Sequence, residues 1–164
     1  MADYCFNRVR VSGELGDVRR LVEQVRSAQS AFDFDRVLPF PPELEGITKR
    51  FLPDGSQSVS VGEHGASEAV ETQRLVATYG YSNWYDWEMA NWGTCSNALA
   101  PVCHLEAEED EGFAQYEFDT KWRPAVGIYQ ELSRRFPSLS IFWFFDVPAS
   151  QEAGYLKAVG LFSP

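Results

Sequence analysis

Histidine, cysteine and positive charge are scarce in this sequence, and each scarcity removes a class of function. The 164 residues include 2 His and 3 Cys, and 14 basic side chains stand against 24 acidic ones, for a net charge of −10. His64 and His104 are far apart, and no Cys-x-x-Cys or His-x-x-His spacing occurs, so we expect no metal ion and no cofactor. The three cysteines, odd in number and widely spaced, indicate reduced thiols. An acidic chain without a basic run argues against nucleic-acid binding.

Long apolar segments, internal repeats and phosphate-binding motifs are also missing from the sequence. The longest apolar run, 141–145, is far too short to span a bilayer. The N-terminus has neither the positive charge nor the apolar stretch of a signal peptide. No Gly-x-Gly-x-x-Gly or Walker pattern is present. We therefore expect a cytoplasmic protein with no membrane partner.

The chain is instead rich in aromatic residues, which make up 15% of it, within a hydrophobic fraction of 45%. This composition excludes a disordered chain, and the length fits one domain with a sizeable core. We accordingly predict a single domain over residues 1–164.

Strand and helix periodicities follow one another in a recognisable order. Alternation predicts strands over 4–12, 102–107, 113–120 and 139–146, with a further short strand at 155–159. Apolar stripes at helical spacing predict amphipathic helices that begin near Asp17 and Pro124. Without the intervening segment, this is the split βαβ order of an α+β, ferredoxin-like fold, an antiparallel sheet with two helices on one face.

A long aromatic-rich insertion, at about 32–100, separates the first helix from the second core strand. Within it we expect a short edge strand at 32–38, an irregular stretch over 43–65 and a helix over 67–79.

The strand around Ile141–Phe145 is apolar on both sides, which favours a central strand with both faces covered. If one face were open instead, Phe142 and Phe144 would form an adhesive patch suited to dimerisation.

A tryptophan-rich stretch over 79–97, together with Asp119 and Trp122 further along the chain, supplies the candidate binding residues. The candidates are Trp84, Trp87, Asn91, Trp92, Asp119 and Trp122. Core packing is favoured for the tryptophans, because aromatic side chains are strongly buried on average, and Trp122 is expected to join the same cluster. The alternative is a recognition surface, since tryptophan is frequent among interface hot spots.

Several motifs resemble the YubB-like family of plasmid and phage proteins, whose domain is described as ferredoxin-like. The matching segments are the 7–13 strand, Phe32-Asp33-Phe34 with Val37-Leu38-Pro39-Phe40-Pro41, Tyr79-Gly80, Asn91-Trp92-Gly93-Thr94, and Phe118 to Pro124. The family pattern usually continues with Lys and Trp where this chain has Cys95 and Ser96. The resemblance implies a fold and a mobile-element setting, and it implies no reaction.

Two functions are compatible with these observations. The favoured one is a non-enzymatic interaction module that binds a protein partner or a second copy through an aromatic surface and an acidic rim. The alternative is a binder of a small molecule, such as a glycan or nucleotide, or an enzyme acting on one. Its pocket would lie between insertion and sheet and would use residues such as Asp86, Asn91 and Asp119.

Overall fold

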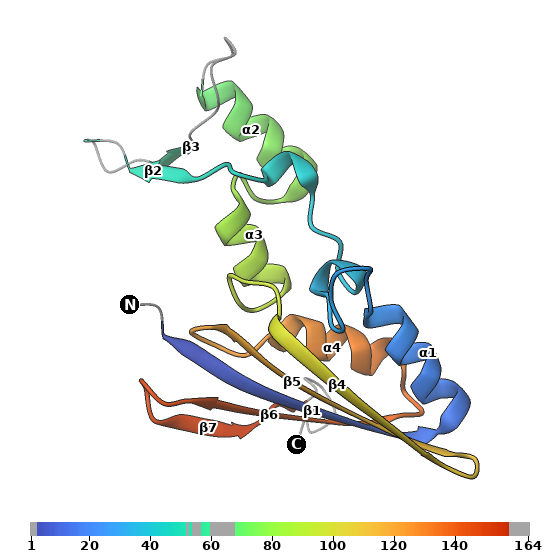
Figure 1. The fold of residues 1–164 in the computed structure, drawn as a ribbon. Coiled ribbons are helices and arrows are strands. Elements are labelled where there is room, and N and C mark those ends of the chain that lie inside the picture. Colours follow the sequence, from blue (N-terminus) through green and yellow to red (C-terminus); the bar gives the residue numbers. More distant parts are fainter. Residues whose placement is uncertain (1–2, 52, 54–56, 60–67, 158–164) are drawn as a thin grey trace, which may run out of the picture. The chain divides into compact units, whose positions relative to one another are not determined.

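The computed structural model describes residues 3–51, 53, 57–59 and 68–157 (Figure 1). The chain divides into two compact units, Met1–Pro39 with Trp92–Pro164, and Phe40–Asn91. We call them the sheet unit and the insertion unit. Among the described residues, no helix is long and apolar enough to cross a bilayer.

The sheet unit is an α+β structure built on five antiparallel strands. Its elements are β1 (Tyr4–Glu14), α1 (Leu15–Val25), the short 3-10 helix η1 (Phe34–Arg36), β4 (Leu99–Glu108), β5 (Glu111–Lys121), α4 (Val126–Arg135), β6 (Ser140–Val147) and β7 (Glu152–Tyr155). The strand order is β4-β5-β1-β6-β7. Helices α1 and α4 lie on the same face of this sheet (Figure 1).

The core lies between that face and the helices, because each strand alternates buried and accessible positions. Val9 and Val11 of β1 pair in register with Tyr116 and Ala114 of β5, and all four are fully buried. Trp143 of β6 lies opposite Val9 of β1 and is also fully buried. Its ring lies 6.1 Å from that of Tyr129 in α4 and 6.0 Å from that of Phe32. The strands predicted over 4–12, 102–107, 113–120 and 139–146 and both predicted helices of this unit are present.

The insertion unit comprises a two-stranded sheet and two α-helices. Its elements are the 3-10 helix η2 (Pro42–Leu44), β2 (Lys49–Phe51), β3 (Gln57–Val59), α2 (Glu68–Tyr79) and α3 (Trp84–Asn91). The Asn83 side chain caps α3 by accepting a hydrogen bond from the Asp86 N–H at 2.9 Å. Asp86 in turn forms an ion pair with Lys49 across 2.9 Å. The predicted helix over 67–79 is confirmed for residues 68–79.

Three local predictions are wrong. The alternation at 32–38 does not form a strand: the Asp33 carboxylate accepts a hydrogen bond from the Asp35 N–H and starts η1 instead. The stretch over 43–65 is not wholly irregular, since η2, β2 and β3 fall within it. The last strand ends at Tyr155, earlier than predicted, and part of the predicted range 155–159 lies outside the described residues.

Candidate functional site

The sheet has a second face, opposite α1 and α4, which we call the open face. By strand register it consists of Phe6, Arg8, Arg10 and Ser12 of β1, Val102, His104, Glu106 and Glu108 of β4, Phe113, Gln115, Glu117 and Asp119 of β5, Phe142, Phe144 and Asp146 of β6, and Tyr155 of β7. Large apolar side chains on it are left in solvent. Phe142 is 59% exposed, Tyr155 60% and Val102 61%.

The exposed β6 side chains overturn the prediction that this strand is covered on both faces. Trp143 and Val147 point into the core, whereas Phe142 is exposed and Phe144 is half-buried. The apolar patch anticipated for an open face is therefore present. β6, which lies between β1 and the edge strand β7, is buried on one side only because α1 and α4 both lie on the same face of the sheet (Figure 1).

Arg8 organises the middle of the open face. Its guanidinium lies 5.6 Å from the centre of the Phe6 ring and 6.0 Å from that of Phe144. Its Nε also donates a hydrogen bond to Glu117, the residue directly opposite on β5, at 3.1 Å. Such exposed pairs contribute little to stability. In this structure they place the Arg8 guanidinium beside both aromatic rings.

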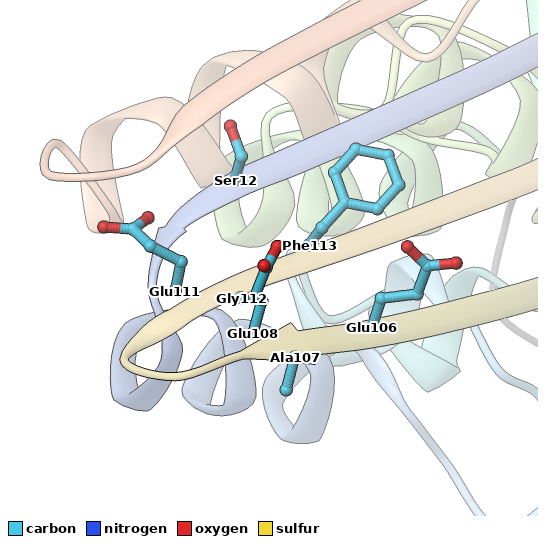
Figure 2. A pocket seen from close by; sticks show the side chains of 7 residues that line it. All are labelled: Ser12, Glu106, Ala107, Glu108, Glu111, Gly112 and Phe113. Atoms are coloured by element: carbon cyan, nitrogen blue, oxygen red, sulfur yellow. The ribbon is translucent and has the colours of Figure 1, made fainter.

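One end of the open face is hollowed and acidic. A depression of about 620 Å³ is lined by Ser12, Glu106, Ala107, Glu108, Glu111, Gly112 and Phe113. Figure 2 shows Ser12, Glu106 and Phe113 directed to one side of the strands and Ala107 to the other. His104 contacts Glu106 with 3.2 Å between Nε2 and Oε1. These carboxylates give the open face an acidic border next to its aromatic centre.

The opposite end of the face is acidic as well. Phe6 lies in register between Asp119 of β5 and Asp146 of β6. Among the residues that make up the face, the cations are Arg8 and Arg10, and the carboxylates are Glu106, Glu108, Glu117, Asp119 and Asp146. Negative charge therefore predominates locally, as it does in the whole chain.

Three of the predicted site residues, Trp84, Trp87 and Asn91, belong to α3 of the insertion unit. Trp87 is only 7% exposed and packs edge-on against Phe40, with 5.4 Å between ring centres. The Asn91 amide donates to the Trp87 carbonyl at 2.9 Å. Trp84 is half-buried. These contacts are those of structural residues, and a binding role for the three stays a prediction.

The other three predicted residues, Trp92, Asp119 and Trp122, belong to the sheet unit and have different environments. Trp92 is 4% exposed, and its indole N–H donates to the Leu38 carbonyl at 2.9 Å. Asp119 is exposed on the open face. Trp122 is 50% exposed, so the expectation that it joins a buried tryptophan cluster is wrong. It follows β5, where a positive backbone φ of 68° turns the chain.

Sequence reasoning did not single out Phe6, Arg8 or Tyr155 as surface residues. A signal for two of them was available, because Phe6 and Arg8 alternate with the buried side of the same strand. The short strand that carries Tyr155 was expected further along the chain, which concealed its register with Phe144.

Within the described part of the chain, no group of three or more His, Cys, Asp or Glu side chains is placed to hold a metal ion. The small-molecule pocket expected between insertion and sheet stays a prediction.

Comparison with known proteins shows a fold and no activity. No protein-family model matches the chain, and no curated protein matches it. Its structure is similar to the crystal structure of protein api92 from Yersinia pseudotuberculosis, with a TM-score of 0.54 over 94% of this chain and 93% of that one. That protein is described by the family model DUF1281, whose function is unknown. The sequences are 13% identical, so the similarity extends to the α+β fold alone.

Proposed function

We propose that this chain is a non-enzymatic protein-interaction module, and that the open face is its docking surface. The exposure of Phe142, Tyr155 and Val102 on one face of a sheet is the observation that carries the proposal. Phe142, Phe144 and Tyr155 are neighbours on β6 and β7, whereas Val102 lies beyond the Arg8–Glu117 pair on β4. Exposing large apolar side chains has a free-energy cost in water, and apolar patches with polar borders are typical of protein interaction sites. Arg8, whose guanidinium lies beside the Phe6 and Phe144 rings, adds a residue type that is frequent among interface hot spots.

We further infer a ferredoxin-like sheet and membership of the YubB-like family. The chain order β1, α1, β4, β5, α4, β6 and the position of β5 between β1 and β4 support the first inference. The motifs around Trp92 and Phe118, together with the similarity to api92 over nearly the whole chain, support the second. The plasmid and phage setting of that family makes a bacterial host cell the place to test for a partner.

The partner we infer is a different protein rather than a second copy of this chain. In a symmetric dimer each open face would place its acidic borders against the same face of its copy, and like charges in apposition oppose association. A partner with basic residues around an apolar centre would complement both the rings and the carboxylates. It would therefore associate fastest at low ionic strength.

Site-specific photocrosslinking in bacterial cells tests this proposal. A photoreactive phenylalanine analogue replaces Phe142 on the open face, and in a matched control it replaces Gln130, an exposed residue of α4. We expect an adduct of one defined mass from position 142 and none from position 130. Added unmodified protein should compete for that adduct, whereas the Phe144→Ser/Tyr155→Ser double variant should compete at least about tenfold less well, since hot-spot truncations cost 1–2 kcal/mol or more.

The readout separates the possible results. Equal labelling from both positions, or competition by the double variant as strong as by the wild type, would refute docking on the open face. An adduct at twice the mass of the chain would refute the choice of a different protein and identify a second copy as the partner.

A further inference from the structure

Trp122 adopts a backbone conformation that tryptophan rarely accepts. Its φ is 68°, in the left-handed region. This conformation is unfavourable for any residue with a Cβ, and for a bulky side chain it is a true outlier. Such a residue persists only where its surroundings enforce it, and such sites concentrate where proteins bind or react.

Hydrogen bonds on both sides of Trp122 enforce this conformation. The Trp122 N–H donates to the Asp3 carbonyl at 2.8 Å, and the Arg123 N–H donates to the Lys121 carbonyl at 2.8 Å. That carbonyl also accepts from the Thr94 hydroxyl at 2.8 Å. The turn is thus held by Asp3, which precedes β1, by Lys121 of β5 and by Thr94.

The enforced turn keeps the Trp122 indole out of the core. Its side chain is 50% exposed, whereas Trp87, Trp92 and Trp143 are 7%, 4% and 0% exposed. The backbone strain and the exposed indole are two separate free-energy costs, and the hydrogen bonds described above act on the backbone and leave the indole exposed. This combination points to a role outside folding.

The indole borders a small hollow whose lining is partly apolar and partly anionic. The hollow has a volume of about 220 Å³ and is lined by Asp3, Trp122, Val147, Ala149 and Ser150. Pockets for drug-sized molecules measure about 300–1,000 Å³, so this one suits a single side chain. Asp119 and Asp146, which flank Phe6 in register, add negative charge at the same end of the sheet.

Tryptophan and aspartate together in the lining of one hollow are suited to a cation. The ring quadrupole attracts ammonium and guanidinium groups, most strongly for tryptophan. The methylene stem of lysine or arginine packs on apolar surface while its head stays polar, which fits Val147 and Ala149 beside Asp3. Lys121 and Arg123 flank Trp122 in sequence but do not line the hollow.

We propose that the Trp122 hollow receives one cationic side chain, arginine or lysine, from the protein partner. This inference rests on the proposed function, and it names the chemistry of one contact at the end of the sheet that is next to Phe6 of the open face. It also gives a reason for a strained and exposed tryptophan in this fold.

The indole N–H signals in a ¹H–¹⁵N NMR spectrum of the full chain provide a direct test. The chain has five tryptophans, and the Trp122→Gly variant identifies the Trp122 signal by its loss. The probes are the capped tripeptides acetyl-Gly-Arg-Gly-amide and its citrulline counterpart, which has nearly the same shape and no charge. We expect the arginine peptide to shift the Trp122 signal saturably. Citrulline should bind at least about fivefold more weakly, since a cation–π contact contributes about 1 kcal/mol.

Two variants separate binding from folding. Asp3→Asn should weaken the arginine-dependent shift while the remaining indole signals stay in place. Trp122→Gly should melt no more than about 2 °C below the wild type, because glycine accepts a positive φ and the indole contributes little to the core. A fall of many degrees in Trp122→Gly would make Trp122 a structural residue and overturn the proposal.

Other results would also overturn it. Equal shifts of the Trp122 signal with the arginine and citrulline peptides would indicate an apolar pocket without preference for a cation. No shift with either peptide would show that the hollow does not bind such a side chain. If position 142 still forms its crosslink but the Trp122 indole signal does not shift with the arginine peptide, the result would refute the cation contact alone and would still support docking on the open face.

Discussion

At the residue scale, Asn7 is the polar centre of the sheet unit's core. It is fully buried on β1, and its amide donates to the Cys5 carbonyl at 3.0 Å and to the Thr120 hydroxyl at 2.9 Å. Its Oδ1 accepts from the Trp143 indole N–H at 2.9 Å. One side chain therefore satisfies polar groups on β1, β5 and β6.

Replacing Asn7 with leucine should cost about 2–4 kcal/mol of unfolding free energy, because more than one buried polar group loses its partner. Urea denaturation measures the change. Gln130→Ala on the exposed side of α4 is the control and should change the free energy by less than about 0.5 kcal/mol. A similarly small loss for Asn7→Leu would show that the network contributes little.

Tyr116 presents the opposite case. Its ring packs edge-on against Phe32, with 4.9 Å between centres, but in the described part of the chain its buried hydroxyl makes no hydrogen bond of normal geometry and has the Cys103 thiol, a weak hydrogen-bonding group, as its polar neighbour. Burial raises the pKa of this phenol well above its ordinary value, and the nearby Cys103 thiol adds to the effect. Since a buried unpaired hydroxyl costs about 1–3 kcal/mol, Tyr116→Phe should leave thermal stability unchanged or raise it. A clear loss of stability would show that the hydroxyl has a partner.

The Cys5 thiol should make stability fall in alkaline solution. Burial raises the pKa of this thiol from 9.0 to about 11. Between these values the unfolded chain releases a proton that the folded chain keeps, so the free energy of unfolding decreases as pH rises, in total by about 2–3 kcal/mol. Burial also raises the pKa of Tyr116 and of Cys103, and both act in the same direction.

Urea denaturation from pH 8 to 11 measures this loss. To isolate the Cys5 contribution, Tyr116→Phe is compared with the same variant carrying Cys5→Ala. The second protein should lose less stability across the interval. Equal slopes for the two would exclude Cys5 as a source.

At the element scale, the Asn91-Trp92-Gly93-Thr94 motif forms a turn that is packed against α4. Gly93 has φ of 90°, and a Cβ built on it would lie 2.7 Å from Val126 Cγ1 and 2.8 Å from the Val126 nitrogen. The Gly127 N–H donates to the Trp92 carbonyl at 3.0 Å. Ser96, at a position where the resembling family usually has tryptophan, accepts the Lys121 N–H at 3.0 Å. The motif therefore has a structural role in this chain.

Gly93→Ala should cost about 2–5 kcal/mol, because it combines backbone strain with a clash against backbone atoms of α4. Gly46→Ala is the matched control, since Gly46 also has a positive φ, of 73°, but a Cβ there meets nothing within 4 Å. The control should lose only the strain, about 1–2 kcal/mol. Equal losses by urea denaturation would show that the Val126 contact is relieved at little cost.

The elements that sequence periodicity predicted well are those whose burial follows one rule along the whole element. Cys5, Asn7, Val9 and Val11 alternate along β1 and are all buried. Phe32 and Phe34 obey the same alternation, yet a local hydrogen bond from the Asp35 N–H to the Asp33 carboxylate decides their backbone conformation. Local capping overrode the strand pattern at that point.

The open face was less predictable, because a strand apolar on both sides does not reveal which side the helices cover. Only the pairing of β6 with β1 places Phe142 beside Arg10 and Phe144 beside Arg8, on the uncovered side. Trp122 was harder still. Its exposure depends on a φ value set by partners from distant parts of the chain, and residue type alone predicts burial for tryptophan.

At the scale of the whole molecule, the insertion unit leaves and re-enters the sheet unit at neighbouring points. The Trp92 indole N–H donates to the Leu38 carbonyl at 2.9 Å, although the two residues are 54 positions apart. Phe34 packs on Trp92 with 5.7 Å between ring centres. The sheet unit therefore closes on itself at this clamp through its own contacts.

Replacing residues 40–91 with a Gly-Ser linker of about four residues, which spans up to about 14 Å, should leave the sheet unit folded. The shortened protein retains Trp92, Trp122 and Trp143, so its NMR spectrum should show their indole signals at dispersed positions. Loss of dispersion would show that the sheet unit needs the insertion unit in order to fold.

The clamp between Leu38 and Trp92 also has a kinetic consequence. Forming it in an unfolded chain means closing a long loop, and the entropic cost rises with the logarithm of loop length. If residues 40–91 collapse first, the loop that remains to be closed is shorter. The entropic cost of bringing β1 together with β4 and β5 is then lower. The effective separation of β1 from β4 and β5, and with it the folding rate, then depends on the order in which the two units fold. The insertion would speed the assembly of the sheet without donating one of its strands.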